Sequence, residues 1–482
     1  MTTLVLAHVA SSGVGVLGLP AWALGYLVAA VLAIVVLVAR ASLLSAPTQP
    51  PATRTDDTAP EATDEAPPAP AHRFGVLGSV AGALGLLVTT VLLAVTLVLA
   101  FFGPRELGAN AAPGLVFTIF WVGGAWLALF LGDVWWRIDP YLAFGRLCDR
   151  VRRARAVRTP GADPDAVPDV VRRWWTAPLV LATFVIIWTA DPLGDQPRRL
   201  AVWLFGFSVV VGLGAIQGGV RGVADLDPFP SVFGLAARLF PWARSRDPST
   251  GGRAGTDPTR AGGADLRTTL ALASLVAAAT FFDRLKGTIL FLRTVKVRTP
   301  FTAWLENVAV LVWAAGLVAA LWWGLGLIAS RILRTPGRAD DDEAPTLGAG
   351  SMPGALLAAS LGPIAMSALL AHTFNTLLVQ VQNVFVRASD PFARGQDLFG
   401  TVDWRIHAPL SVRADAWVQL AILTFGHAAA IWIVRGTCQA AAVPATGRAR
   451  RSDRQRSLRA ALPAFGLIIV SGIAWTLLLL GA

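Results

Sequence analysis

The stretch LGSVAGALGLLVTTVLLAVTLVLAFF, residues 77–102, decides the fold class of this chain. It contains no charged side chain, and an α-helix of this length, rising about 1.5 Å per residue, is about 39 Å long. The apolar core of a bilayer is about 30 Å thick, so the segment is long enough to cross it. Its apolar residues are continuous rather than alternating, which favours a helix over a barrel strand.

Similar apolar stretches recur along the whole chain. Hydrophobic residues make up 55% of the sequence and charged residues only 15%, whereas a soluble protein carries about 25% charged residues. This deficit is expected where much of the surface faces lipid. The sequence therefore predicts an all-α fold, a polytopic transmembrane helix bundle of about ten spans, at residues 19–39, 77–102, 114–136, 174–190, 200–219, 268–283, 304–330, 354–386, 414–434 and 460–480.

Composition also divides the chain into three parts. Residues 1–44 are expected to form an N-terminal outer segment and the first span. Residues 45–75 are rich in Pro, Ala and acidic residues, have little to bury, and are predicted to be a disordered linker. Residues 76–482 are expected to form the transmembrane bundle of about nine spans, with a weak internal repeat as one interpretation.

The distribution of arginine predicts the orientation of the bundle. The net charge is +11, and arginines concentrate beside the apolar spans in three loops, 137–173, 220–267 and 435–459. Cytoplasmic loops carry such an excess, so these loops are predicted to be cytoplasmic and both termini to lie outside a plasma membrane. The bilayer, rather than a nucleic acid, is the partner that this pattern indicates.

One basic segment disagrees with this topology. Arg284, Lys286 and Arg293 would lie on the outer side. Either residues 268–303 re-enter the membrane, or the span count is wrong by one at this point.

Three loops repeat an Asp-Pro-aromatic pattern. Aspartate caps a turn, and proline fixes φ at the first position of a helix. The pattern predicts either three helix starts at the membrane interface or an internal repeat of helix pairs, as in many transporters. The three copies are Asp139-Pro140-Tyr141, Asp227-Pro228-Phe229 and Asp390-Pro391-Phe392.

A stripe of polar side chains runs along the span at 354–386. Polar groups within lipid are costly, so such a stripe lines a cavity or meets another polar helix. Helical spacing places most of these residues on one side and Gln380 on the neighbouring flank. The stripe consists of His372, Asn375, Thr376, Gln380 and Asn383, and it ends near Asp390.

His427, in the next span, is the predicted partner of His372. Two imidazoles can ligate a divalent metal ion if a third ligand is present, and His8, Asp390 and Asp283 are the candidates. Proton transfer is the other chemical role for such a pair. The structural alternative is that the two histidines hydrogen-bond neighbouring backbone or amide groups and form a polar clasp between adjacent helices.

The segment Ser389-Asp390-Pro391-Phe392-Ala393-Arg394-Gly395-Gln396-Asp397-Leu398-Phe399-Gly400-Thr401 resembles the hallmark of a family of bacterial and archaeal polytopic membrane proteins, some of them called fenitrothion hydrolases. Phe392, Ala393 and Gln396 depart from the family pattern. Ala371-His372, Phe282-Asp283 and Gly426-His427-Ala428 also look like family positions. The resemblance implies cleavage of an organophosphate ester by a metal-activated water, with His372, His427, Asp390 and Arg394 as the candidate catalytic residues.

Three functions are compatible with these patterns. The first is transport of a small solute through a polar cavity lined by Asn375, Thr376, Gln380 and Asn383. The second is the membrane-embedded, metal-dependent hydrolase that the resemblance implies. The third is a non-catalytic assembly subunit, which needs no site. No HExxH, GxSxG or Walker motif is present, so the common protease, lipase and NTPase sites are excluded.

Overall fold

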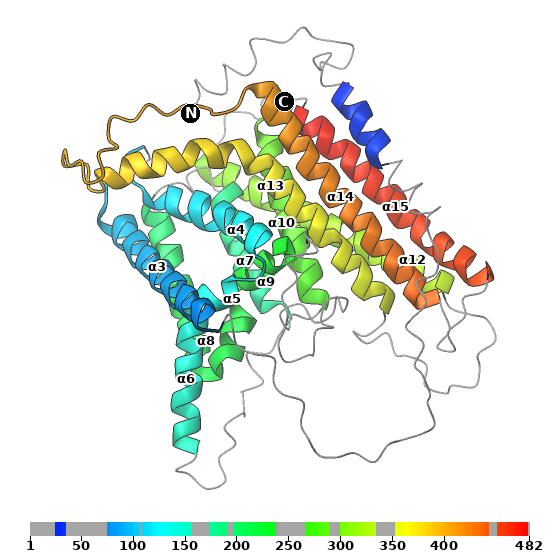
Figure 1. The fold of residues 1–482 in the computed structure, drawn as a ribbon, viewed down its shortest axis with the longest axis horizontal. Helices are drawn as coiled ribbons and strands as arrows, with labels where there is room; N and C mark the ends of the chain where they lie inside the picture. Colours follow the sequence, from blue (N-terminus) through cyan, green and yellow to red (C-terminus); the bar gives the residue numbers. More distant parts are fainter. Residues whose placement is uncertain are drawn as a thin grey trace.

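The uncharged stretch at 77–102 forms one continuous helix, α3 (Gly75–Phe102), in the computed structural model (Figure 1). The structure describes residues 25–34, 75–106, 108–156, 174–190, 197–237, 239, 266–288, 299–333, 352–442 and 451–480. All regular elements within these ranges are helices, which confirms the all-α expectation.

Within the part of the chain that the structure describes, eight helices are long and apolar enough to cross a membrane. The protein is therefore an integral, multi-pass membrane protein. The eight are α3, the continuous pair η1 (Gly114–Gly123) and α4 (Gly124–Leu131), α8 (Pro197–Leu226), α10 (Leu266–Lys286), α12 (Pro300–Leu333), α13 (Met352–Ser389), α14 (Val412–Ala442) and α15 (Arg451–Leu480).

The other two expected spans contain shorter apolar helices. Gly25–Ile34 lies within the expected span 19–39, and α7 (Thr176–Val185) with η2 (Ile186–Ala190) covers the expected span 174–190. Eight of the ten predicted spans are thus long helices. The predicted linker lies almost entirely outside the described residues, as do both termini.

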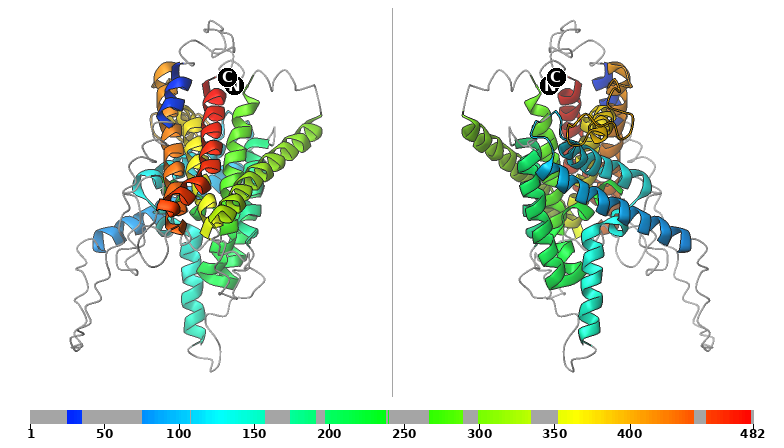
Figure 2. Two further views of the ribbon diagram at one scale, coloured as in Figure 1. Left: turned by 90° about the vertical axis from the view of Figure 1, so that its right-hand side faces the viewer. Right: turned by 90° about the vertical axis from the view of Figure 1, so that its left-hand side faces the viewer.

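Helices α13, α14 and α15 lie side by side and form one half of the bundle (Figure 1). Helix α10 packs against α13 and α12, and α15 packs against α12 and α14. On the other side, α8 packs against α3 and α6 (Pro140–Ala156). The basic helix α6 projects beyond the rest of the bundle at one end (Figure 2).

Aromatic side chains fill the centre of the bundle. Short helix α9 (Phe229–Ala237) is buried along its whole length and places Phe229 and Phe233 there. Their rings pack edge to face or tilted on Trp121 and other aromatic rings at centroid distances of 4.7–6.3 Å, an arrangement that aromatic quadrupoles favour. Gly124 leaves the space that Phe233 occupies, since a Cβ there would lie 2.7 Å from the ring.

In the region that disagreed with the predicted topology, α10 runs without a break to Lys286, and α12 begins at Pro300. Residues 289–298, with Arg293, lie outside the described residues. Arg284 and Lys286 occupy the last turn of α10, and both have partners within the bundle, as the site geometry shows.

Candidate functional site

Asp283, in the last turn of α10, is the centre of an ionisable cluster. Its Oδ2 lies 2.9 Å from His372 Nε2 on α13, and its Oδ1 lies 3.2 Å from Lys286 Nζ. The i, i+3 spacing places Asp283 and Lys286 on the same face of α10. The side chains are mostly buried, with 29% exposure for Asp283, 28% for Lys286 and 14% for His372.

The cations of this turn also satisfy carbonyl groups at the ends of other helices. Arg284 donates two hydrogen bonds to α15, from Nε to Leu478 O at 3.1 Å and from a terminal nitrogen to Leu479 O at 2.7 Å. Lys286 donates to Thr189 O at the end of η2. The last carbonyls of a helix have no partners within it and carry partial negative charge, so cations stabilise them. The end of α10 therefore ties α13, α15 and η2 together.

His427 has a different environment from His372. Its Nδ1 donates to Leu423 O at 2.8 Å within α14, and its Nε2 lies 3.4 Å from Ser471 Oγ on α15. The side chain is fully buried. Each histidine therefore has its own partner on a different helix, Asp283 on α10 for His372 and Ser471 on α15 for His427. The backbone contact of His427 is of the kind that the structural alternative describes, whereas His372 pairs with a carboxylate.

A shared metal centre needs a third ligand. Within the described part of the chain, no three His, Cys, Asp or Glu side chains are grouped so that they could bind a metal ion. His8 lies outside the described residues, and Asp390 makes other contacts. A metal at His372 and His427 stays a prediction.

The polar stripe continues along α13 beyond His372. Asn383 Nδ2 donates to Gln380 Oε1 at 3.0 Å, so these two amides satisfy each other in part. Asn375, Gln380 and Asn383 are half-buried and Thr376 is exposed. Gln382 holds the loop that follows α13, since its Nε2 donates to His407 O at 2.9 Å. The cavity-lining role of the stripe stays a prediction.

The segment that carries the family resemblance forms an ordered, largely exposed loop after α13. Asp390 accepts backbone hydrogen bonds from Arg394 and Gly395, both at 2.8 Å. These bonds hold the pKa of Asp390 below its usual value. The Arg394 guanidinium lies over the Phe392 ring, 5.5 Å from its centroid. Asp390 and Arg394 thus have partners within the loop itself.

Other residues of the same segment also stabilise the loop. Ser389 Oγ lies 2.7 Å from Asp397 Oδ1 and accepts the Phe399 N–H at 2.9 Å. Gly395 and Gly400 have φ values of 77° and 67°, which an L side chain rarely adopts. The hallmark residues found from the sequence are explained by the turns they make.

Two of the three Asp-Pro turns start helices, as expected. Asp139 Oδ1 accepts the Tyr141 N–H at 2.7 Å and precedes α6. Asp227 Oδ1 accepts the Phe229 N–H at 2.9 Å and precedes α9. The third copy does not start a helix, since Phe392 and the residues after it form the irregular loop. The expectation of three helix starts is wrong for this copy, because Asp390 caps a local turn instead.

The two helix-starting aspartates contact each other, a feature that the sequence did not reveal. Both are buried, and Asp139 Oδ2 has no donor among the described groups unless Asp227 carries a proton. Burial raises the pKa of Asp139 to about 6. Burial and then the charge of Asp139 raise the pKa of Asp227 well above its usual value. Burial and the mutual repulsion of the two carboxylates therefore favour a state in which one of the pair keeps its proton.

The carboxyl pair and the Asp283 cluster lie at opposite ends of α10. Thr176 donates to Asp225 O near the carboxyl pair, and Thr268 donates to the adjacent Trp174 O. Thr268 lies in the first turn of α10 and Asp283 in the last, about 22 Å apart along the helix axis. Each end of α10 thus lies near a separate cluster of ionisable groups.

Comparison with known proteins adds no relative. No protein-family model, no curated protein and no solved structure matches the chain.

Proposed function

We propose that this protein is a proton-coupled transporter of a small solute in the plasma membrane, and that Asp283 and His372 bind the transported proton. The observation that carries the proposal is the 2.9 Å contact between these side chains, contributed by two helices that are long enough to span a membrane. Ionisable groups within membrane-spanning helices are costly and are found in ion pathways and proton relays.

The chemistry of the cluster suits proton exchange. Histidine is the side chain whose ordinary pKa lies nearest to physiological pH, so small changes in its surroundings switch its charge. Asp283 can pair with His372 or with Lys286, and Lys286 also holds the end of η2. A proton that leaves His372 therefore leaves Asp283 with a counter-charge. The amides of the α13 stripe supply hydrogen-bonding groups for a solute on the same helix.

The hydrolase alternative needs a metal ion at the same place. His372 and Asp283 are acceptable ligands for a divalent metal. However, the Lys286 ammonium lies against the Asp283 oxygen that His372 leaves free, and a second cation there would be repelled. Proton transfer therefore fits this set of groups better than metal binding, and a non-catalytic assembly role would use the cluster only to hold these helices together.

Proteoliposomes containing a pH-sensitive dye provide the test. The full chain is reconstituted and exposed to a panel of amino acids, sugars, organic acids and inorganic anions. We expect at least one solute to move protons across the membrane, and Asp283→Asn to abolish this flux. The control is Glu106→Gln, which neutralises an exposed acid far from α10 in the sequence.

Two results would contradict the proposal. The first is solute-driven proton flux that Asp283→Asn leaves unchanged. The second is purified protein that contains stoichiometric divalent metal, with the metal lost in His372→Ala, which would favour the hydrolase.

A further inference from the structure

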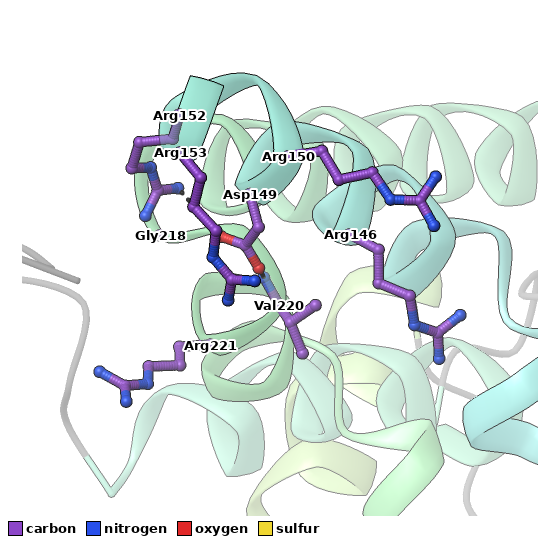
Figure 3. A pocket seen from close by; sticks show the side chains of 8 residues that line it. All are labelled: Arg146, Asp149, Arg150, Arg152, Arg153, Gly218, Val220 and Arg221. Atoms are coloured by element: carbon purple, nitrogen blue, oxygen red, sulfur yellow. Dashed lines mark hydrogen bonds and ion pairs between the residues drawn. The ribbon is translucent and has the colours of Figure 1, made fainter. Parts of the chain in front are cut away.

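A basic cavity lies between α6 and the kinked end of α8. Its volume is about 440 Å³, and five arginines and one acid line it (Figure 3). Ligand sites of small molecules have volumes of about 300–1,000 Å³. The charged lining residues are Arg146, Asp149, Arg150, Arg152, Arg153 and Arg221.

The backbone around the cavity is held in a specific conformation. Gly219 kinks α8 with a φ of 60°, and a Cβ at this position would overlap the Asp149 carboxylate. Asp149 Oδ2 accepts the Val220 N–H at 3.0 Å, which the kink frees from the helix. Gly145 of α6 also approaches Gly219 closely, since a Cβ there would lie 3.0 Å from the Gly219 carbonyl carbon. Glycine is thus required for the contact that forms one wall.

The single negative charge of Asp149 does not neutralise the positive charge of the arginines that line the cavity. Asp149 uses one oxygen for the Val220 N–H and the other for Arg152, at 3.5 Å. Arg150, Arg153 and Arg221 are exposed and have no ion pair with any residue that the structure describes. Five arginines therefore line the cavity with one carboxylate, and Figure 3 shows Arg153 and Arg221 on one side of Asp149, whereas Arg146 and Arg150 extend to the other side. Their mutual repulsion is relieved by binding an anion.

Guanidinium groups suit one class of anion in particular. The planar fork of arginine donates two parallel hydrogen bonds to a phosphate, and clusters of arginine recognise phosphate more strongly than single cations do. An excess of arginine at one end of a membrane protein is a general property of cytoplasmic loops. That property does not account for their arrangement around a cavity with a fixed wall.

We infer that this cavity binds a phosphate-bearing ligand. The phosphate contacts Arg153 and Arg221, which lie on the same side of the cavity, while Asp149 keeps the wall at Gly219 and Val220 in place (Figure 3). The cavity lies next to the end of α8, a membrane-spanning helix, and on α6, which projects beyond the bundle (Figure 2). Both the head group of an anionic phospholipid and a soluble phosphate ester can reach such a position, and basic pockets at this level bind lipid head groups in other membrane proteins.

Two binding measurements on the full chain distinguish a phospholipid head group from a soluble phosphate ester as the ligand. Purified protein is titrated with inorganic phosphate by equilibrium dialysis, and protein in nanodiscs is assayed for retention of phosphatidylglycerol over phosphatidylcholine by native mass spectrometry. Saturable phosphate binding without lipid preference assigns a soluble ligand. Retention of phosphatidylglycerol without phosphate binding assigns a lipid head group.

The variant Arg153→Gln should weaken whichever binding is found by about tenfold or more. The matched control is Arg155→Gln, which removes an exposed arginine of α6 that does not line the cavity. Equal losses in the variant and the control would mean that only net charge matters and would overturn the inference. So would the absence of both kinds of binding in the unchanged protein.

A measurement on the unchanged protein avoids any folding defect of the variants. Phenylglyoxal modifies accessible arginines, and the modified positions are read by mass spectrometry. Phosphate, or phosphatidylglycerol in the nanodisc, should protect Arg153 and Arg221 but not Arg155. Equal modification of all three with and without the ligand would contradict the inference.

Discussion

The two ionisable sites at opposite ends of α10 offset the desolvation of their buried carboxyls in different ways. At one end Asp283 has two cationic or basic partners, His372 and Lys286, so it can remain an anion. At the other end Asp139 has Asp227 as its neighbour, so burial and repulsion raise the pKa of both carboxyls and disfavour ionisation of the pair. A neighbouring cation keeps a buried carboxyl ionised, whereas a neighbouring carboxylate favours the protonated form of a buried carboxyl. The difference predicts opposite responses to substitution and to pH.

The largest effect should come from Asp283→Asn. The substitution leaves Lys286 mostly buried without its counter-charge, and an unpaired buried charge costs about 3–5 kcal/mol. Since Asp283 is 29% exposed, we expect a loss of about 3 kcal/mol in the free energy of unfolding, at the lower end of that range. Thermal unfolding in detergent measures it.

The double variant Asp283→Asn/His372→Gln sharpens the assignment of the partner. If the 2.9 Å contact is a true ion pair, the two single losses should not add, and a coupling energy of about 1–3 kcal/mol is expected. Additive losses would show that Asp283 acts through Lys286 alone.

The carboxyl pair should make stability fall as pH rises. A group whose pKa is higher in the folded protein binds more protons there, so its stabilisation is complete below the unfolded value and is lost as pH rises through the folded value. For Asp139 this window lies between its usual pKa of 3.8 and about 6, and Asp227 extends it upwards. At about 1.36 kcal/mol per pKa unit, the change attributable to Asp139 is of order 3 kcal/mol.

Melting temperatures measured between pH 4 and pH 8 give the slope of stability against pH and so test this prediction. Asp227→Asn should flatten the slope, because the amide donates to Asp139 without a carboxyl proton. The lowered pKa values of Asp390 and Asp397 act below this window and with the opposite sign, since their stabilisation is lost only as pH falls. A slope unchanged in Asp227→Asn would show that the pair is not its source.

A smaller effect should distinguish the N-cap role of Asp227 from its role in the carboxyl pair. Asp227→Ala removes the acceptor of the Phe229 N–H, and the loss of an N-cap costs about 0.5–2 kcal/mol. Asn is also a good cap, so Asp227→Asn should keep most of this stability at neutral pH. Chemical denaturation at pH 8 compares the two variants, and equal stability would mean that the cap contributes nothing.

The smallest effect should come from Tyr141→Phe. The Tyr141 hydroxyl lies 2.7 Å from Ser208 Oγ, and burial raises the pKa of Tyr141, so the phenol stays protonated beside the carboxyl pair. Removing one such hydrogen bond costs about 0.5–1.5 kcal/mol. Denaturation of Tyr141→Phe, alone and combined with Asp227→Asn, shows whether Tyr141 stabilises α8 through Ser208 or also contributes to the acid pair.

Part of the candidate site was predictable because its signals are local. His372 and Asp283 stood out as ionisable groups in apolar segments, and helical spacing placed the amides of α13 on one side. The partner of His372 was not predictable, because it depends on which faces of α10, α13 and α14 meet. The sequence favoured His427 from the adjacent span, whereas the hydrogen bond of His372 is made with Asp283 of α10.

The Asp-Pro turns illustrate the same limit. A capping aspartate bonds backbone groups two or three residues away, so the starts of α6 and α9 followed from the sequence alone. That Asp139 and Asp227 lie together depends on how α9 is buried in the bundle, which no local pattern encodes. The same turn at Asp390 forms no helix, because the glycines after it adopt left-handed conformations that hold the loop instead.

By itself the sequence determined that the chain is an all-helical integral membrane protein, because apolar length and the absence of charge act within each segment. Only the tertiary structure decided the contact of Asp283 with His372, the pairing of Asp139 and Asp227, and the basic cavity at Gly219. These features join residues from different helices, and their geometry depends on side-chain packing between elements far apart in the chain.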